Sequence, residues 1–167
     1  MNARPEIDQP SAPLHMAAES FDAFYRQEYP GQFKRAVLLL GSQADAADSV
    51  AQAFTKVYEK WDRVHEPGPY LNRAVLNACR DVGRRRRRLD VVDAPTETSS
   101  TDSYDSGELT RVLLSLPYKQ RAVVVLKHWG GLREQDIADL LDIAPGSVGP
   151  TLARAHKRLK PLLGGLR

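Results

Sequence analysis

The sequence predicts an all-α protein in which a flexible acidic linker joins two small helical domains, the second containing a helix-turn-helix. Three observations lead to this prediction. Apolar residues recur at helical spacing in both halves, strand-like alternation is nowhere convincing, and a stretch without Lys or Arg separates the halves. A chain of 167 residues with 42% hydrophobic content can form two small domains with real cores.

Composition excludes several classes of protein. The only cysteine is Cys79, so neither an internal disulfide nor a cysteine-based zinc site can form, and we expect a cytoplasmic protein. No segment approaches the roughly 20 apolar residues that cross a bilayer, so membrane insertion is not expected. Residues 1–19 contain three prolines and lack the apolar stretch of a signal peptide, which predicts a disordered N-terminal arm.

Residues 20–89 are expected to form a domain of three helices. The first has apolar residues at i, i+3, i+4, i+7 spacing over residues 33–40 and ends at Gly41. The second begins near Asp45, an acidic residue suited to a helix N-terminus, and repeats that spacing. The Pro-Gly-Pro sequence at 67–69 breaks the chain, and a third helix then runs from residue 70 into the arginine run at 84–88.

The third helix carries a basic face that suits nucleic acid. Arg73, Asn77, Arg80 and Arg84 step by four, three and four residues, so they share one side of the helix. Arginines at that spacing can follow a phosphate backbone, and an asparagine can read a base edge. An isolated arginine run is as often a solvated face or a localisation signal, but this run closes an amphipathic helix, which favours nucleic acid.

Aromatic rings stand in the loop before this helix. Trp61, His65 and Tyr70 could cradle an unstacked base. The alternative interpretation places Trp61 and Tyr70 in the core; it is favoured for Trp61, and neither alternative is favoured for Tyr70.

Residues 90–107 form the expected linker. The stretch 89–110 has six acidic residues and no Lys or Arg, and it has too few large apolar residues to offset its ordering entropy. Fully extended, the 18 residues of the linker reach about 60 Å, so the two domains could occupy well-separated sites.

Residues 108–167 are expected to form the helix-turn-helix domain. The apolar pattern and the Pro and Gly positions predict four helices, at residues 109–116, 120–129, 134–141 and from 147 onward. Ser147 is expected to cap the last one. A short helix, a turn with Gly and a basic amphipathic helix are typical of DNA-binding pairs, whose second helix enters the major groove. Such pairs also occur without DNA, but Arg154, Lys157 and Arg158 favour the DNA-binding interpretation.

Three stretches in order resemble the extracytoplasmic-function (ECF) sigma factors of the sigma-70 family. Region 2.2 of that family is similar to residues 45–61, DAADSVAQAFTKVYEKW. Regions 2.3 and 2.4 are similar to residues 70–88, YLNRAVLNACRDVGRRRRR. Region 4 is similar to residues 113–148, LLSLPYKQRAVVVLKHWGGLREQDIADLLDIAPGSV. Each motif alone is weak, but their order and spacing from residue 21 to 163 make the resemblance specific.

The resemblance implies a promoter-recognition subunit of bacterial core RNA polymerase, not an enzyme, with no catalytic residue, metal or cofactor. The first domain would dock on the β′ clamp helices and capture the −10 element, and the second would sit by the β-flap and read the −35 element. An anti-sigma factor is a further partner that the family allows. By position, the docking residues are Asp48, Phe54 and Lys56. With the residues found above, the −10 surface comprises His65, Tyr70, Arg73, Asn77, Arg80, Arg84, Arg85 and Arg88. The −35 surface comprises Ser147, Thr151, Arg154, Lys157 and Arg158.

Two departures from the family pattern affect these expectations. Ala51 stands where family members usually have Gln, and this is expected to weaken one polar docking contact. The recognition helix opens with Gly-Ser-Val-Gly-Pro at 146–150 in place of Gly-Thr-Val-Lys-Ser. Proline is tolerated in a first helical turn, but Gly149 and Pro150 remove a lysine and a hydroxyl that commonly contact DNA. Recognition of −35 should therefore depend on Thr151, Arg154 and Lys157.

Three other functions are consistent with part of the sequence, and one of them, an adaptor that binds polymerase without reading promoters, is left open by Gly149 and Pro150. A stand-alone helix-turn-helix transcriptional regulator explains residues 134–160 but leaves the first domain without a role and lacks a spare dimerisation helix. A metal-dependent nuclease would need a ligand cluster, but carboxylates such as Asp45 and Asp48 at helix starts are more often caps, and the four histidines show no ligand spacing.

Overall fold

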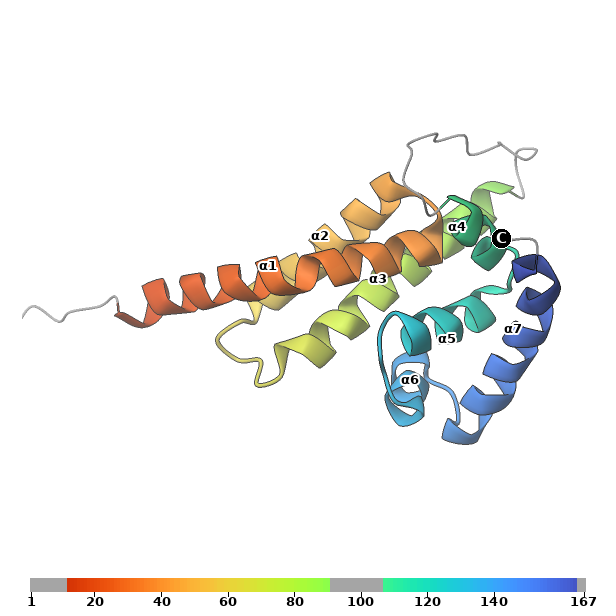
Figure 1. Cartoon of the computed structure of the whole chain (residues 1–167). Helices are drawn as coiled ribbons and strands as arrows, with labels where there is room; N and C mark the ends of the chain where they lie inside the picture. Colours follow the sequence, from red (N-terminus) through yellow and green to blue (C-terminus); the bar gives the residue numbers. More distant parts are fainter. Residues whose placement is uncertain (1–11, 91–106, 165–167) are drawn as a thin grey trace, which may run out of the picture.

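The computed structural model describes residues 12–90 and 107–164, which form helices and no strand, so the all-α prediction is confirmed. Figure 1 shows the long helices α1, α2 and α3 lying side by side and the shorter α4 to α7 packed near one end of them. In chain order the helices are α1 (Ala12–Leu40), α2 (Gln43–Glu59), α3 (Pro67–Asp90), α4 (Gly107–Leu114), α5 (Tyr118–His128), α6 (Glu134–Leu141), the 3-10 helix η1 (Pro145–Ser147) and α7 (Val148–Leu163).

Two helices begin earlier than expected. We expected a disordered arm over residues 1–19; residues 1–11 lie outside the described part of the chain, but 12–19 belong to α1. Ala, Leu, Met and Glu in this stretch are strong helix formers, and Pro13 falls in the first turn, where it is tolerated. The Pro-Gly-Pro at 67–69, expected to break the chain, is the first turn of α3. Amides there have no intrahelical acceptor, so prolines cost little.

The junction between α1 and α2 follows the sequence prediction. Gly41 ends α1 with a φ of 69°, a left-handed conformation that glycine adopts without strain. Ser42 caps α2, because its Oγ accepts a hydrogen bond from the Asp45 amide at 3.2 Å. Asp45 lies in the first turn of α2, where a carboxylate interacts favourably with the helix dipole.

A buried polar contact fixes α3 against α1. Gln32 is 1% exposed, and its Nε2 donates a hydrogen bond to Asn72 Oδ1 at 2.7 Å. Arg35 Nη1 donates to the same oxygen at 3.1 Å. Both donors come from α1 and the acceptor from α3, so the contact sets the rotation of α3 and with it the direction of its exposed face.

The second domain is built around α5. Residues 122–126 of α5 are each at most 4% exposed, and α7 packs on them through Val148, Ala155 and Leu159. Asp142 follows α6 with a φ of 54°, which turns the chain toward η1 and α7. Helices α6 and α7 therefore form the expected helix-turn-helix.

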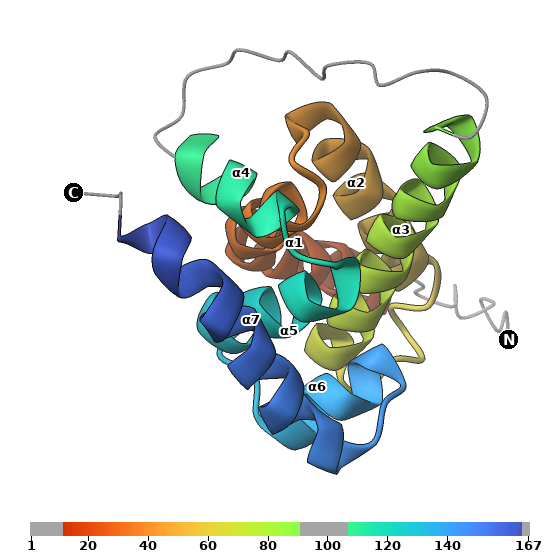
Figure 2. The ribbon, with the colours of Figure 1, turned by 90° about the vertical axis from the view of Figure 1, so that its right-hand side faces the viewer.

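The two domains pack against each other. α1 contacts α4 and α5, and α3 contacts α6, as Figure 2 shows from the side of the second domain. Of the expected linker, residues 91–106 lie outside the described part of the chain. None of the helices in the described ranges is long and apolar enough to span a membrane.

Candidate nucleic-acid interface

The basic face predicted for α3 is its solvent-exposed face. Arg73, Asn77 and Arg84 are exposed and Arg80 is half-buried. The opposite side of α3 is buried, with Leu71, Ala74, Val75, Leu76, Ala78 and Cys79 each at most 7% exposed. The side chains that could follow a phosphate backbone therefore lie on one ridge whose direction the packing fixes.

The arginine run at the end of α3 divides into two kinds of residue. Arg84, Arg85 and Arg88 are exposed, as a DNA-binding role requires. Arg86 instead turns back into the protein: its Nη1 donates to the Leu40 carbonyl at 2.7 Å and its Nη2 pairs with Asp45. Arg86 thus satisfies a carbonyl at the C-terminus of α1 and anchors the end of α3. No feature of the sequence separates Arg86 from the neighbouring arginines.

The aromatic residues before α3 also differ in environment. Trp61 is half-buried, with ring centroids 5.2 Å from those of Phe21 and Phe24, so the core interpretation holds for it. Tyr70 is half-buried, and Lys60 Nζ lies 5.4 Å from its ring centroid, so one face of the ring is already occupied by a cation. His65 is exposed.

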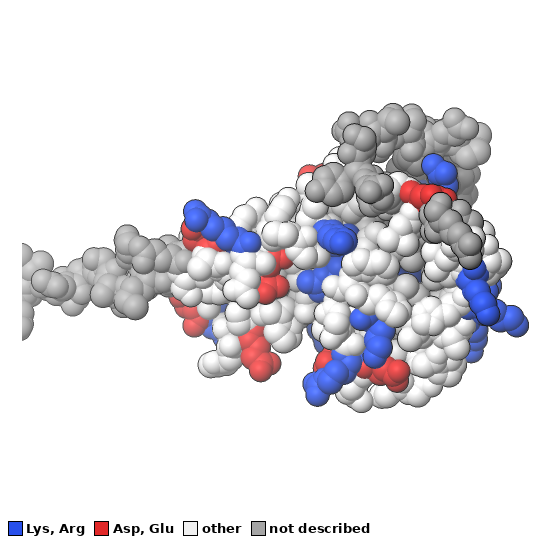
Figure 3. Space-filling view, viewed as in Figure 1, with Lys and Arg blue, Asp and Glu red and all other residues white. Residues whose placement is uncertain are grey.

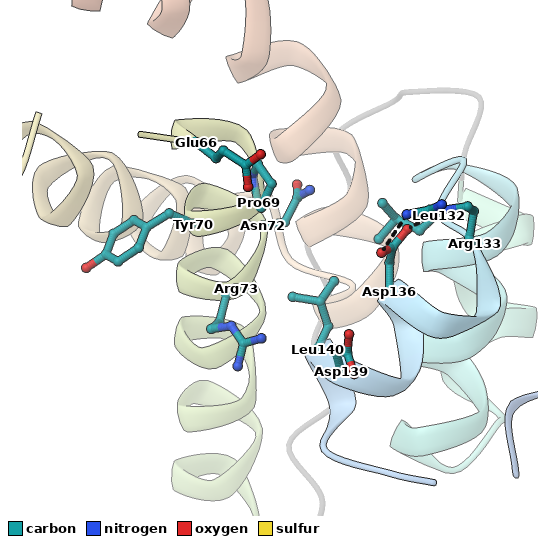
Figure 4. Close-up of a pocket in the computed structure, with 10 residues that line it drawn as sticks. All are labelled: Glu66, Pro69, Tyr70, Asn72, Arg73, Leu132, Arg133, Asp136, Asp139 and Leu140. Atoms are coloured by element: carbon teal, nitrogen blue, oxygen red, sulfur yellow. Dashed lines mark hydrogen bonds and ion pairs between the residues drawn. The ribbon is translucent and has the colours of Figure 1, made fainter. Parts of the chain in front are cut away.

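A cleft of about 550 Å³ lies between the two domains beside this face. Figure 4 shows Tyr70 and Arg73 on the α3 side and Asp136, Asp139 and Leu140 on α6 opposite. Arg133 donates a hydrogen bond from Nε to Asp136 Oδ2 at 3.0 Å, and this bond lowers the pKa of the Asp136 carboxyl. The sequence did not predict that a carboxylate-bearing helix would stand across from the basic ridge.

The second helix of the helix-turn-helix, α7, presents a basic edge. Arg154, Lys157 and Arg158 are exposed, and Figure 3 shows blue side chains along the outer edge of α7. Two expectations for this helix are not met. Thr151 is only 4% exposed, because it shares the inward stripe with Val148. Ser147 does not cap α7 through its side chain; its hydroxyl donates to the Ala144 carbonyl at 2.7 Å, within η1.

The expected docking face on α2 has two exposed members. Asp48 and Lys56 point to solvent, whereas Phe54 is 3% exposed and packs among the rings of α1. Its ring centroid lies 4.6 Å from that of Tyr25 and 6.1 Å from that of Phe24. In this structure Phe54 supports the helix from inside and is not available for direct contact with a partner.

Among the described residues, other reactive side chains do not form a closed metal site. In the part of the chain that the structure describes, no three His, Cys, Asp or Glu side chains converge as metal ligands. His128 and His156 approach through their Nε2 atoms at 3.1 Å and link α5 to α7 at the surface. Burial raises the pKa of the Cys79 thiol to about 12, so it remains protonated at neutral pH.

Comparisons with known proteins agree with this geometry. Residues 106–159 match the family described as Sigma-70, region 4. The ECF RNA polymerase sigma factor SigM of Mycobacterium tuberculosis is 31% identical over 165 residues, covering 91% of this chain and 82% of its own length. The RNA polymerase sigma-E factor of Streptomyces avermitilis is 29% identical over 154 residues, covering 87% and 86%.

Solved structures show the same fold over both domains. The sigma factor RpoE of Bartonella quintana, in complex with the anti-sigma factor NepR, matches with a TM-score of 0.72 and 22% identity, covering 89% of this chain and 99% of that one. CnrH, in complex with the cytosolic domain of CnrY, matches with a TM-score of 0.66 and 22% identity, covering 90% and 94%. The extent and identity of the match to SigM show that this chain belongs to the ECF sigma factors of the sigma-70 family.

Proposed function

We propose that this sigma factor contacts its promoter at two places, the −10 element through α3 and its preceding loop, and the −35 element through α7. As a sigma factor it directs core RNA polymerase to promoters. The single observation that carries the two-site assignment is that each domain turns one helix with an exposed basic edge to solvent. A stand-alone helix-turn-helix regulator would need only the second domain, whereas the relatives match over both.

The −10 assignment rests on the ridge of α3. Arg73, Arg84, Arg85 and Arg88 supply exposed guanidinium groups, and Asn77 supplies an exposed amide between them. Phosphate contacts position a strand, and base contacts specify it. We assign the arginines to the first role and Asn77 to the second, with His65 and Tyr70 beside the end of the ridge.

The −35 assignment rests on Arg154, Lys157 and Arg158 of α7. Because Thr151 is buried, the exposed residues that remain of the expected surface on α7 are these three, and all of them are charged. Pro150 lies in the first turn of α7, where it does not interrupt the helix, but neither it nor Gly149 offers a side-chain donor. Base reading in the major groove therefore falls on Arg154, the first long polar side chain of the helix.

The remaining partners are core RNA polymerase and an anti-sigma factor. Asp48 and Lys56 form the exposed part of the α2 face that would dock on the β′ clamp helices, and the second domain would dock on the β-flap. One fold neighbour, the sigma factor RpoE, was solved with the anti-sigma factor NepR, which supports a similar partner for this chain.

Run-off transcription with purified core polymerase tests the proposal, on promoters selected by this protein. Arg154→Ala should weaken −35 binding by about 5- to 150-fold, because one good base contact is worth about 1–3 kcal/mol. Arg26→Ala is the matched control, because Arg26 is an exposed arginine on α1 outside both proposed surfaces. Failure of the wild-type chain to bind core polymerase or to start a transcript would refute the proposed function. Equal binding by Arg154→Ala and Arg26→Ala would refute the −35 assignment.

A further inference from the structure

Two histidines from different helices come together on the surface of the second domain. His128 is the last residue of α5 and His156 lies within α7, and their Nε2 atoms are 3.1 Å apart. The two ring centroids are 5.4 Å apart, and the ring planes are tilted by 40° to each other. Both side chains are exposed. Because 28 positions of sequence separate them, no spacing of histidines along either helix predicts the pair.

The core of the second domain fixes the two helix backbones that carry these histidines. Residues 122–126 of α5, which precede His128, are each at most 4% exposed. On α7, Ala155 and Leu159 lie on either side of His156 and are 0% and 5% exposed. The two helices also pack directly on each other. The core, and not a contact between the imidazoles, therefore sets the separation of the two side chains, so the pair is preorganised.

The separation of the two nitrogens suits a single metal ion. Bonds from zinc to imidazole nitrogen are about 2.0–2.1 Å long, so two nitrogens on one ion are about 2.9 Å apart at a right angle and about 3.4 Å apart at a tetrahedral angle. The observed 3.1 Å lies between these values. The outer dihedral angle of a histidine side chain is soft. A small rotation of each exposed ring would therefore aim both lone pairs at one ion.

The hydrogen bond between the rings uses the same atoms as a metal would. For one Nε2 to donate to the other, the accepting Nε2 has to be without a proton. A metal ion requires both Nε2 atoms to be without one, which a neutral imidazole provides when its proton is on Nδ1. The hydrogen-bonded pair thus differs from the metal-binding pair by one proton and a small movement of the rings.

The donor atoms decide which class of ion fits. Imidazole nitrogen suits Cu²⁺, Ni²⁺ and Zn²⁺, whereas Mg²⁺ and Ca²⁺ take oxygen ligands. Within the described ranges no further His, Cys, Asp or Glu joins these two histidines to make a set of three ligands. An ion at this site would therefore take two nitrogens from the protein and complete its coordination with water, which the exposure of both rings allows.

We propose that His128 and His156 form a binding site for a divalent transition-metal ion, which links α5 to α7. A bound ion joins the helix assigned to the −35 element to the central helix of its domain. An ion that binds the folded chain and not the unfolded chain stabilises the fold. Neither histidine belongs to the surfaces assigned to promoter or polymerase binding, so the site does not depend on the proposed function.

Calorimetric titration of the full chain with zinc chloride tests the site. His128→Gln and His156→Gln each remove one ligand nitrogen and keep an exposed polar side chain. His65→Gln is the matched control, because His65 is an exposed histidine of the first domain. We expect one tightly bound Zn²⁺ per wild-type chain, at least tenfold weaker binding in both variants of the pair, and no change in the control. Equal affinity in the wild type and either variant of the pair, or an equal loss in the control, would overturn the proposal.

Two further titrations test the class of the ion and its position. Mg²⁺ should not bind, and binding of Mg²⁺ as tight as that of Zn²⁺ would overturn the assignment to transition metals. The ring centroid of Trp129 lies 6.2 Å from that of His128, so a Cu²⁺ ion at the pair should quench its fluorescence. Trp61→Phe leaves Trp129 as the only tryptophan. Cu²⁺ should quench this chain at least twice as strongly as the same chain with His156→Gln, and equal quenching would place the ion elsewhere and overturn the site.

Thermal unfolding followed by circular dichroism tests the link between the two helices. Zn²⁺ at about 100 times its dissociation constant should raise the midpoint of the wild type by about 5–10 °C. The midpoint of His156→Gln should not change. An unchanged midpoint in the wild type would mean that the unfolded chain binds Zn²⁺ equally well, and would overturn the folded pair as its site. None of these measurements uses polymerase or DNA, so their failure leaves the proposed function untouched.

Discussion

Phe54 provides the sharpest test of how the first domain is built. Its ring is 3% exposed, with the ring centroids of Tyr25, Phe24 and Phe21 at 4.6, 6.1 and 6.4 Å. Burying such a side chain is worth about 1.5–3 kcal/mol, and each aromatic pair adds about 0.5–1.5 kcal/mol. Phe54→Ala should therefore lower the free energy of unfolding by about 3–5 kcal/mol, the usual range for removing a buried ring.

Urea denaturation followed by circular dichroism measures this loss. With a slope of about 2 kcal/mol per molar urea, the midpoint should fall by about 2 M. Tyr58→Ala is the control, because Tyr58 is 60% exposed and makes an edge-to-face contact with Phe21, with 4.9 Å between the two ring centroids. Its cost should stay below about 1.5 kcal/mol. An unchanged midpoint in Phe54→Ala, together with lost binding to core polymerase, would refute the core assignment and restore Phe54 as a direct docking contact.

Three further predictions follow from local geometry. Gly41→Ala should lower the free energy of unfolding by about 1–2 kcal/mol from the left-handed backbone alone, and by more because the new Cβ overlaps Leu114. Adding Leu114→Ala should recover only the loss due to that overlap, as measured by a double-mutant denaturation cycle. Thr151→Ser should change thermal stability but not the base preference at −35, measured by binding to a promoter set, because Thr151 is 4% exposed. Arg133→Ala should raise the pKa of Asp136, as measured by NMR titration, because the bond from Arg133 lowers that pKa. The bond stabilises the fold fully at a pH above 3.8, the ordinary pKa of the carboxyl, and this stability is lost as the pH falls through the lowered pKa of the folded state.

Most of the helices could be predicted from periodicity because packing and pattern agree. The expected helix at 134–141 coincides with α6, and the end of the first helix at Gly41 and the start of the second near Asp45 are confirmed. The errors fall where local signals conflict with helix formation. Residues 67–69 contain two prolines, which break a helix interior but not a first turn, and the sequence alone does not say where a helix begins.

Two predicted site residues are buried in this structure, and the sequence already contained the conflict. Phe54 follows Val50 by four residues on the apolar stripe of α2, yet the family resemblance assigned it to docking. Thr151 lies three residues after Val148 and four before Ala155, which puts it on the buried stripe of α7. In both cases the periodicity was the better guide to where the side chain points, because packing fixes the rotation of a helix whatever its partners are.

The domain contact could not have been predicted from pattern at all. Arg121 bonds to Leu39 across 82 positions of sequence, and a bond to a backbone carbonyl leaves no trace in the identity of the accepting residue. The same holds for Arg86, whose partner Leu40 is the next carbonyl of α1. Two consecutive carbonyls that α1 cannot satisfy internally are thus taken by arginines from two other helices.

This shared anchorage attaches α3 and α5 to the same end of α1. Arg86 and Arg121 are close enough that the charge of Arg86, after burial, further lowers the pKa of Arg121. Asp45, paired with Arg86, offsets part of the repulsion between the two guanidinium groups. Arg86 finds both of its partners, the Leu40 carbonyl and Asp45, within the first domain. The end of α3 is therefore anchored within the first domain, independently of the contacts that Arg121 makes.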